Sequence, residues 1–181
     1  MIGRTPEWFP HQLDLANDRV ALLRMSEADY RAASFLDQRA LRPGAEMRVV
    51  EWKALAAEMP ADARRDVQYI FHIGNVGSTL ISRLLGELRS VLALREPLLL
   101  PGTSLDTLTA LLSRTFRQEQ RAIVKATSFT SEIAHRLVPE ASNALFLFAT
   151  LQHYLENILA GENSRQLLQI VSPSRLQRLQ T

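Results

Sequence analysis

The feature that most constrains the fold is a regular alternation in the later part of the chain, where short apolar segments are separated by amphipathic ones. In chain order the apolar segments read VQYIFHI, VLAL, RAIVKA and ALFLFA. Between them, residues such as Leu80, Leu84 and Leu88 recur at helical spacing. Near-continuous apolar strands alternating with amphipathic helices are typical of a parallel sheet covered on both faces. Residues 66–181 therefore predict an α/β core with a parallel sheet of about four to five strands and flanking helices.

Residues 1–65 predict an α-rich segment that packs on this core. Ser26 and Asp29 form a capping box at the start of a helix over EADYRAASFLDQRAL, which a Pro-Gly pair ends. A second helix is predicted over AEMRVVEWKALAAEM, ending before Pro60. The stretch RVALLRM fits either a short strand or a helical turn, because its periodicity does not distinguish the two.

Composition narrows the classes of partner and site. The formal net charge of +2 gives no strong field toward nucleic acid or an anionic membrane. The absence of cysteine excludes disulfides, thiolate metal sites and cysteine nucleophiles. The N-terminal stretch does not resemble a signal peptide, and no apolar run approaches the roughly 20 residues of a membrane span. We therefore expect a cytoplasmic protein without a nucleic-acid or membrane partner.

The basic residues are almost all arginine, since Lys53 and Lys125 are the only lysines. A planar guanidinium suits phosphate and sulfate better than an ammonium does. The same bias also arises from codon usage in a GC-rich genome, so composition alone leaves both explanations open.

The stretch YIFHIGNVGSTLISRLLGEL predicts a buried strand, a glycine-bearing turn and the start of a helix. Gly74 and Gly77 permit positive φ and close approach, and Ser78 and Thr79 bring hydroxyls to the helix start. Backbone N–H groups and the helix N-terminus then surround one spot that stabilises an anion. An ordinary strand-to-helix turn with Ser/Thr capping fits the same residues.

A nucleoside-triphosphatase loop would need a lysine where Ser78 stands. In addition, the segments RAIVKATS and ALFLFAT end in small neutral residues, and neither supplies an aspartate for magnesium. The sequence therefore disfavours ATP hydrolysis and predicts no metal site.

The segments FHIGNVGSTLISRLLGEL, VLALREPLLL and RAIVKATS, in this order and spacing, resemble the sulfotransferase family, in particular its bacterial P-loop-like members. The resemblance covers roughly residues 66–170. It implies a P-loop NTPase-like sulfotransferase fold, with 3′-phosphoadenosine 5′-phosphosulfate as the sulfuryl donor and no metal. The acceptor would be a hydroxyl or amine of a small molecule or carbohydrate.

Site residues follow from the same resemblance. It implies that the donor's phosphosulfate end is bound by Gly74, Asn75, Val76, Gly77, Ser78 and Thr79. Asn75 stands where the family carries a cation, so Arg83 or Arg95 is expected to supply that charge. Glu96 is the expected general base, and the alternative for it is a salt bridge with Arg95 or Arg83, or a cap near Pro97.

The resemblance also has departures. Ala149 stands in place of an arginine that binds the 3′-phosphate, and Asn157 in place of a serine on the following helix. Asn157 is expected to keep a donor contact. Family members usually continue further, so the core is expected to be incomplete at its C-terminus, with weak donor binding, slow turnover and self-association through unpaired sheet edges.

Two further functions remain open on the sequence. One is a non-enzymatic module that binds an anion or nucleotide, and the other is a P-loop kinase or NTPase. His72 alternates with apolar residues and predicts a hydrogen-bonded core histidine. Lys125 ends the third apolar segment, where it either reaches an anion or extends to the surface.

Overall fold

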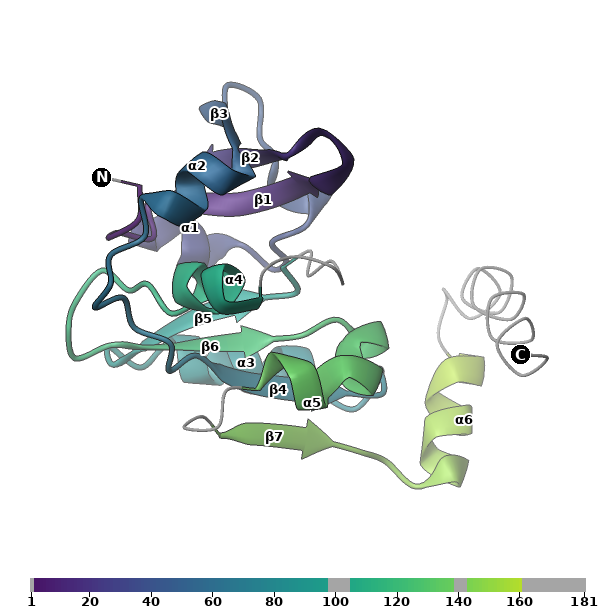
Figure 1. Ribbon diagram of the computed structural model, residues 1–181. Helices are drawn as coiled ribbons and strands as arrows, with labels where there is room; N and C mark the ends of the chain where they lie inside the picture. The colour runs from purple at the N-terminus through teal and green to yellow at the C-terminus, as the bar shows by residue number, and fades with distance from the viewer. Residues whose placement is uncertain (1, 98–104, 139–142, 161–181) are drawn as a thin grey trace.

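The computed structural model describes residues 2–97, 105–138 and 143–160, which form two sheets (Figure 1). The first sheet and its helices comprise β1 (Trp8–Asp14), the 3-10 helix η1 (Leu15–Asn17), β2 (Arg19–Arg24), α1 (Glu27–Ala32), η2 (Gln38–Ala40), β3 (Met47–Glu51) and α2 (Trp52–Ala57). The second comprises β4 (Gln68–His72), α3 (Ser78–Gly86), β5 (Val91–Arg95), α4 (Leu105–Leu112), β6 (Arg121–Lys125), η3 (Ser128–Ile133), α5 (Ala134–Leu137), β7 (Ala144–Leu147) and α6 (Leu151–Ala160).

The predicted parallel sheet is present, and each of the four apolar segments forms one of its strands. The strand order is β5-β6-β4-β7, and every neighbouring pair is parallel. In Figure 1, α3 lies on one face of this sheet, and α4 and α5 lie on the other. Because all four strands run the same way, their carboxyl ends meet at one edge, where ligands bind in open α/β sheets.

The N-terminal part is a correction to the sequence prediction, because it contains a three-stranded antiparallel sheet and only short helices. The strands pair in the order β1-β2-β3. The ambiguous RVALLR is β2, and MRVVE, predicted as helix, is β3, where Val50 pairs with Val20. Pairing with β2 holds MRVVE in an extended conformation, although the residues that follow it favour a helix. The remaining helix of that stretch, α2, begins only at Trp52.

Helix α1 begins where predicted and ends early. Ser26 Oγ accepts a hydrogen bond from the Asp29 N–H at 3.2 Å, and the Asp29 carboxylate accepts one from the Ser26 N–H at 2.8 Å. This capping box is confirmed. The helix stops at Ala32, and four residues later the Leu36 N–H donates to the carbonyl of Arg95 at 2.7 Å. Ala33 is already extended, and the chain after the helix contacts the end of β5.

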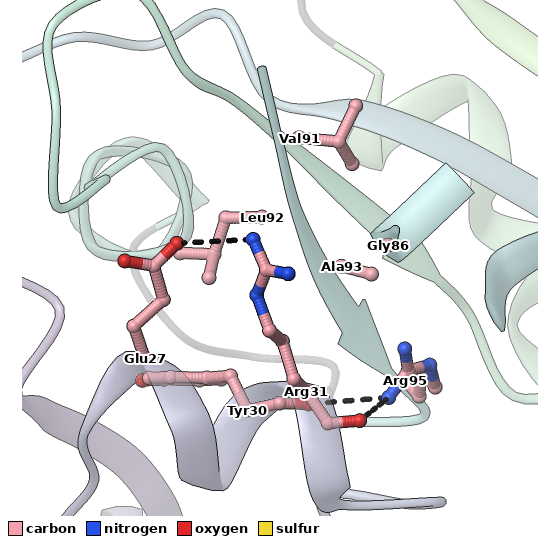
Figure 2. Close-up of a pocket in the computed structure, with 8 residues that line it drawn as sticks. All are labelled: Glu27, Tyr30, Arg31, Gly86, Val91, Leu92, Ala93 and Arg95. Atoms are coloured by element: carbon pink, nitrogen blue, oxygen red, sulfur yellow. Dashed lines mark hydrogen bonds and ion pairs between the residues drawn. The ribbon is translucent and has the colours of Figure 1, made fainter. Parts of the chain in front are cut away.

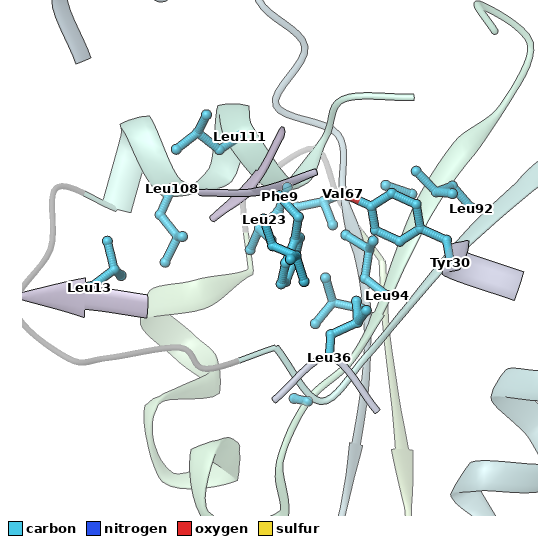
Figure 3. Close-up of a cluster of buried hydrophobic side chains, with 14 of the residues drawn as sticks. Phe9, Leu13, Leu23, Tyr30, Leu36, Val67, Leu92, Leu94, Leu108 and Leu111 are labelled. Carbon is cyan, nitrogen blue, oxygen red and sulfur yellow. The ribbon is translucent and has the colours of Figure 1, made fainter. Parts of the chain in front are cut away.

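One hydrophobic core joins the two sheets. Figure 3 shows side chains from β1, β2, α1, β5 and α4 converging, among them Phe9, Leu13, Leu23, Tyr30, Leu92, Leu94, Leu108 and Leu111. Each large apolar side chain buried in this way contributes about 1.5–3 kcal/mol relative to an exposed one. The Tyr30 hydroxyl reaches the Pro6 carbonyl at 2.7 Å, so its polar end is also satisfied inside the core.

Many of the exposed large hydrophobic residues belong to the half of the chain that contains the parallel sheet. Most exposed large hydrophobic residues of the described chain lie on or just after α3, at or just after β7, and on α6: Leu80, Leu84, Leu88, Leu145, Phe146, Phe148, Leu151, Leu155 and Leu159. Strand β7 is also an edge strand of the described sheet. Among the described helices, none is both long and apolar enough to cross a membrane.

Candidate functional site

The predicted phosphate loop connects β4 to α3 at the carboxyl edge of the parallel sheet. Gly74, Asn75 and Gly77 have φ values of 91°, 49° and 77°, so the chain turns through the left-handed region three times before the helix begins at Ser78. A β-carbon is costly in such a conformation, which accounts for the two glycines. Asn75 and Gly77 are exposed and Ser78 is buried, so the loop lies open to solvent.

His72, the last residue of β4, holds the start of this loop. Its ring Nδ1 accepts a hydrogen bond from the Gly74 N–H at 3.1 Å, and its Nε2 lies 2.9 Å from the carbonyl oxygen of Ala126. The side chain is buried, as predicted for a hydrogen-bonded core histidine. Burial, with a contribution from the positive charge of Lys125, lowers the pKa of His72 below 6.5, while Glu96 acts in the opposite direction.

Asn157 of α6 also contacts this loop. Its amide Nδ2 donates to the Asn75 carbonyl at 3.2 Å, although the two residues are 82 positions apart. Figure 1 shows α6 beyond the carboxyl ends of β4 and β7. The structure thus brings the predicted Asn157 to the predicted loop. Ala149, in the place of the expected arginine, is partly buried between β7 and α6.

Glu96 directly follows β5 and has a positive φ of 52°. Its N–H donates to the Lys125 carbonyl at 2.7 Å, which fixes the backbone of Glu96 at the carboxyl end of β6. Its carboxylate forms an ion pair with the Lys125 ammonium and lies 3.7 Å from the Arg39 guanidinium. Glu96 is therefore in a salt bridge, but its partners are Lys125 and Arg39 and not the expected Arg95 or Arg83.

The position of Lys125 differs from both interpretations of the sequence, in which it either reaches an anion or extends to the surface. Only 1% of its surface is exposed, so it neither extends into solvent nor presents a free ammonium. Its side chain lies in the same cluster as Glu96 and the ring of Phe35, which is 5.6 Å from the ammonium. A buried ammonium requires a compensating charge, and Glu96 provides it.

Residues 34–39, which follow α1 and run into η2, form a strap that borders this cluster. The Arg39 guanidinium lies 3.5 Å from the centre of the Phe35 ring and is bound by both oxygens of Asp37. Hydrogen bonds from Arg39 hold the pKa of Asp37 below its usual value. Arg39 received no role from the sequence, because no local pattern links it to Glu96, 57 positions later.

The two arginines predicted as catalytic cations take other positions. The exposed Arg83 donates to Ser34 Oγ at 2.5 Å, so it is directed at the strap. Arg95 is only 3% exposed, and its Nη1 donates to the carbonyls of Tyr30, Arg31 and Ala33 at 2.5–3.2 Å.

Figure 2 shows this environment of Arg95, a small pocket bounded by α1, β5 and Gly86 of α3. The Arg95 guanidinium caps the carbonyl end of α1, where a cation is favourable. Because this guanidinium is buried and already donates to three carbonyls, it does not fit the expectation that Arg95 stabilises charge on a donor.

In the part of the chain that the structure describes, no group of three or more histidine, aspartate or glutamate side chains is placed to hold a metal ion. Comparison of the chain with family models, curated proteins and solved structures found no match to any of them.

Proposed function

We propose that the chain is a sulfotransferase-like protein that binds the phosphosulfate end of 3′-phosphoadenosine 5′-phosphosulfate and transfers its sulfuryl group to a hydroxyl or amine acceptor. The observation that carries the proposal is the loop from Gly74 to Thr79, with its three positive φ values, at the same sheet edge as Glu96 and Lys125. The resemblance in sequence order and spacing supplies the reaction class.

Anion binding rests on the loop itself. Successive N–H groups at the start of α3 and the partial positive charge of that helix stabilise a phosphate or sulfate group. Asn75, which carries no charge, leaves this site weaker than a loop with a cation. We therefore expect measurable but weak donor binding.

Transfer requires a base for the acceptor and positive charge for the leaving group. The acceptor oxygen or nitrogen attacks sulfur, its proton passes to the Glu96 carboxylate, and the bond from sulfur to the bridging oxygen breaks. The electron pair of that bond stays on the phosphate of the released nucleotide. Lys125 balances the charge of Glu96, and the exposed Arg39 guanidinium lies 3.7 Å from that carboxylate.

The binding test compares two glycine variants by isothermal titration with 3′-phosphoadenosine 5′-phosphate. Gly77→Val should abolish binding, while Gly44→Val is the matched control, because Gly44 has a similar φ of 79° but lies outside the site. A β-carbon added at either glycine would meet no other atom within 4 Å, so both changes act mainly through backbone conformation. Unchanged affinity in Gly77→Val would remove the loop from the proposal.

The activity test follows radiolabelled sulfate from the donor to a panel of hydroxyl and amine acceptors. Glu96→Gln should lower turnover by a factor of about 10²–10⁴, the usual range for loss of a general base. Glu46→Gln is the control, because Glu46 is also paired with an arginine but lies on the surface. Rates are compared per folded molecule, since Glu96 also compensates a buried charge. Full activity in Glu96→Gln would remove its role as base.

A binding module without transfer activity is the second candidate, and one observation favours it. The Glu96 carboxylate is already engaged by Lys125 and Arg39, which leaves it less free to accept a proton. Nucleotide binding without sulfuryl transfer to any acceptor would select this candidate. A gain in ATP affinity with magnesium, or ATP turnover, would instead select a P-loop kinase or NTPase.

A further inference from the structure

We propose that His72 is a positioning residue for the phosphate loop, and that protonation of its Nδ1 releases Gly74, disorders the loop and weakens anion binding. This inference rests on the proposed anion site. It adds to that site a form of regulation, namely loss of ligand on acidification.

The contacts of the ring fix its tautomer. The Ala126 carbonyl can only accept a hydrogen bond, so Nε2, 2.9 Å away, carries the ring proton. The Gly74 N–H can only donate, so Nδ1, 3.1 Å away, must keep its lone pair. Both bonds are satisfied at once only by the neutral imidazole protonated on Nε2.

These two bonds connect three parts of the site. His72 ends β4, Ala126 follows β6, and Gly74 is the first residue of the loop with a positive φ. The ring therefore holds the loop against the carboxyl ends of two neighbouring strands. Among the described residues, the Gly74 N–H is held by this ring nitrogen, so the position of the loop start depends on that acceptor.

Protonation would place a second N–H opposite the Gly74 N–H. The bond would be lost, and the two donors would repel each other. Other groups around the ring also act on it. Lys125 of β6 opposes a second positive charge and Glu96 after β5 favours one, while Arg39 and Lys125 already engage that carboxylate.

The uncharged neighbours are Ser131 of η3, whose hydroxyl donates to the His72 carbonyl at 3.5 Å, and Leu147 of β7, which pairs with His72 in the sheet. Burial disfavours the imidazolium further and lowers the pKa of His72 below 6.5, so the change is expected on the acid side of that value.

A competing effect has the opposite sign. An imidazolium would attract a bound anion, and that attraction alone would make affinity rise on acidification. Sulfate is the probe that separates the two effects, because it remains doubly charged across the whole range, whereas phosphate changes its own charge. The sign of the pH dependence therefore decides between lost geometry and gained charge.

The experiment titrates sulfate into the full chain by ¹H–¹⁵N NMR between about pH 8 and pH 5, on either side of the ordinary histidine value. Wild-type affinity should fall about fivefold to tenfold on acidification, the equivalent of one net hydrogen bond. His72→Asn places an amide oxygen near the position of Nδ1 and cannot titrate, so its affinity should stay flat. His72→Gln keeps the reach toward Ala126 but not the acceptor for Gly74, so it should bind weakly at every pH.

His11→Asn is the control for general acid destabilisation. His11 is also buried, and burial likewise lowers its pKa, but it lies on β1 away from the loop. It should retain the wild-type pH profile of sulfate binding. An affinity that is constant or rises on acidification, or an equal acid loss in His72→Asn, would overturn the inference.

A second measurement needs no ligand. The ¹⁵N shifts of the His72 ring report its tautomer, and hydrogen exchange reports protection of the Gly74 amide. Protection should disappear as the ring is protonated. If the wild type binds no sulfate at any pH, the proposed function fails, and this measurement still decides the inference: a Gly74 amide that stays protected when His72 is charged contradicts it.

Discussion

At the scale of single residues, the carboxyl edge of the parallel sheet carries buried charges that, among the described residues, already have partners. Lys125 is compensated by Glu96, and Arg95 by the carbonyls that end α1. Such groups are expensive to bury, and removing one partner costs more than the pair contributes. The residues that set this edge therefore affect stability as well as ligand binding, and the two effects must be measured separately.

The Glu96–Lys125 pair should respond asymmetrically to substitution. Glu96→Ala leaves an ammonium whose side chain is only 2% exposed without a counter-charge, and should cost about 3–5 kcal/mol of unfolding free energy. Lys125→Met leaves a carboxylate that is 19% exposed and still near Arg39, so it should cost less. Chemical denaturation of both variants and of the double variant measures this. A larger loss in Lys125→Met, or strictly additive losses, would contradict the prediction.

Gly86 should be intolerant of even a methyl group. A β-carbon there would lie 2.7 Å from Nη2 of Arg95, whose guanidinium is held by three carbonyls and cannot easily move. Gly86→Ala should therefore lower the unfolding free energy by about 1–3 kcal/mol, despite the better helix propensity of alanine.

The control for this change is Ser82→Ala, one turn earlier on the buried face of α3. The Ser82 hydroxyl is buried without a hydrogen-bond partner among the described residues, so its removal should be neutral or slightly stabilising. Thermal unfolding of the two variants side by side provides the test, and a stable Gly86→Ala protein would show that Arg95 can shift.

At the scale of elements, what could be predicted from sequence depends on how local the determining contacts are. The four parallel strands and the loop at Gly74–Thr79 follow from short apolar runs and glycine positions. β3 could not be predicted, because MRVVE precedes a helix-favouring run and becomes a strand only by pairing with β2. The ion pair of Glu96 with Lys125 was missed for the same reason, since contacts between separate strands leave no local pattern.

The capping box of α1 should contribute to stability in a pH-dependent way. Hydrogen bonds from Ser26, first from its side chain, lower the pKa of Asp29 below 3.8, so the folded state favours the ionised carboxylate. This stabilisation is present above the unfolded pKa and is lost as pH falls through the folded value. Ser26→Ala should cost about 0.5–2 kcal/mol at neutral pH and progressively less in acid. Urea unfolding at several pH values measures it, and a loss that is independent of pH would count against the mechanism.

At the scale of the whole molecule, the antiparallel and parallel sheets depend on one another through a shared core and one buried arginine. Arg114, just after α4, donates to the carbonyls of Ile2, Trp8 and Leu111 at 2.5–2.8 Å. Burial lowers the pKa of Arg114 to about 10, which still leaves it charged at neutral pH. The exposed apolar residues of β7 and of the following α6 lie at the β7 edge of the parallel sheet, and self-association there stays a prediction.

Arg114→Met should weaken the attachment of the N-terminal strands. Three backbone carbonyls lose their donor, so the unfolding free energy should fall by about 2–4 kcal/mol. Arg4→Met is the control, because Arg4 is 55% exposed and 4.0 Å from its partner Asp62, so its loss should be within about 0.5 kcal/mol. Guanidinium denaturation followed by tryptophan fluorescence is suitable, because Trp8 lies next to the lost contact. Equal stability of the two variants would show that Arg114 contributes no attachment.

The position of β4 between β6 and β7 has a consequence for synthesis on the ribosome. Both neighbours of β4 come later in the chain, so β4 emerges with neither edge paired, and its second edge is paired only once Leu147 has been made. The antiparallel sheet, by contrast, is complete at Glu51 and pairs strands that follow one another in sequence. Local contacts form faster than distant ones. We therefore expect the N-terminal sheet to fold first during translation and to provide the surface on which the later strands assemble.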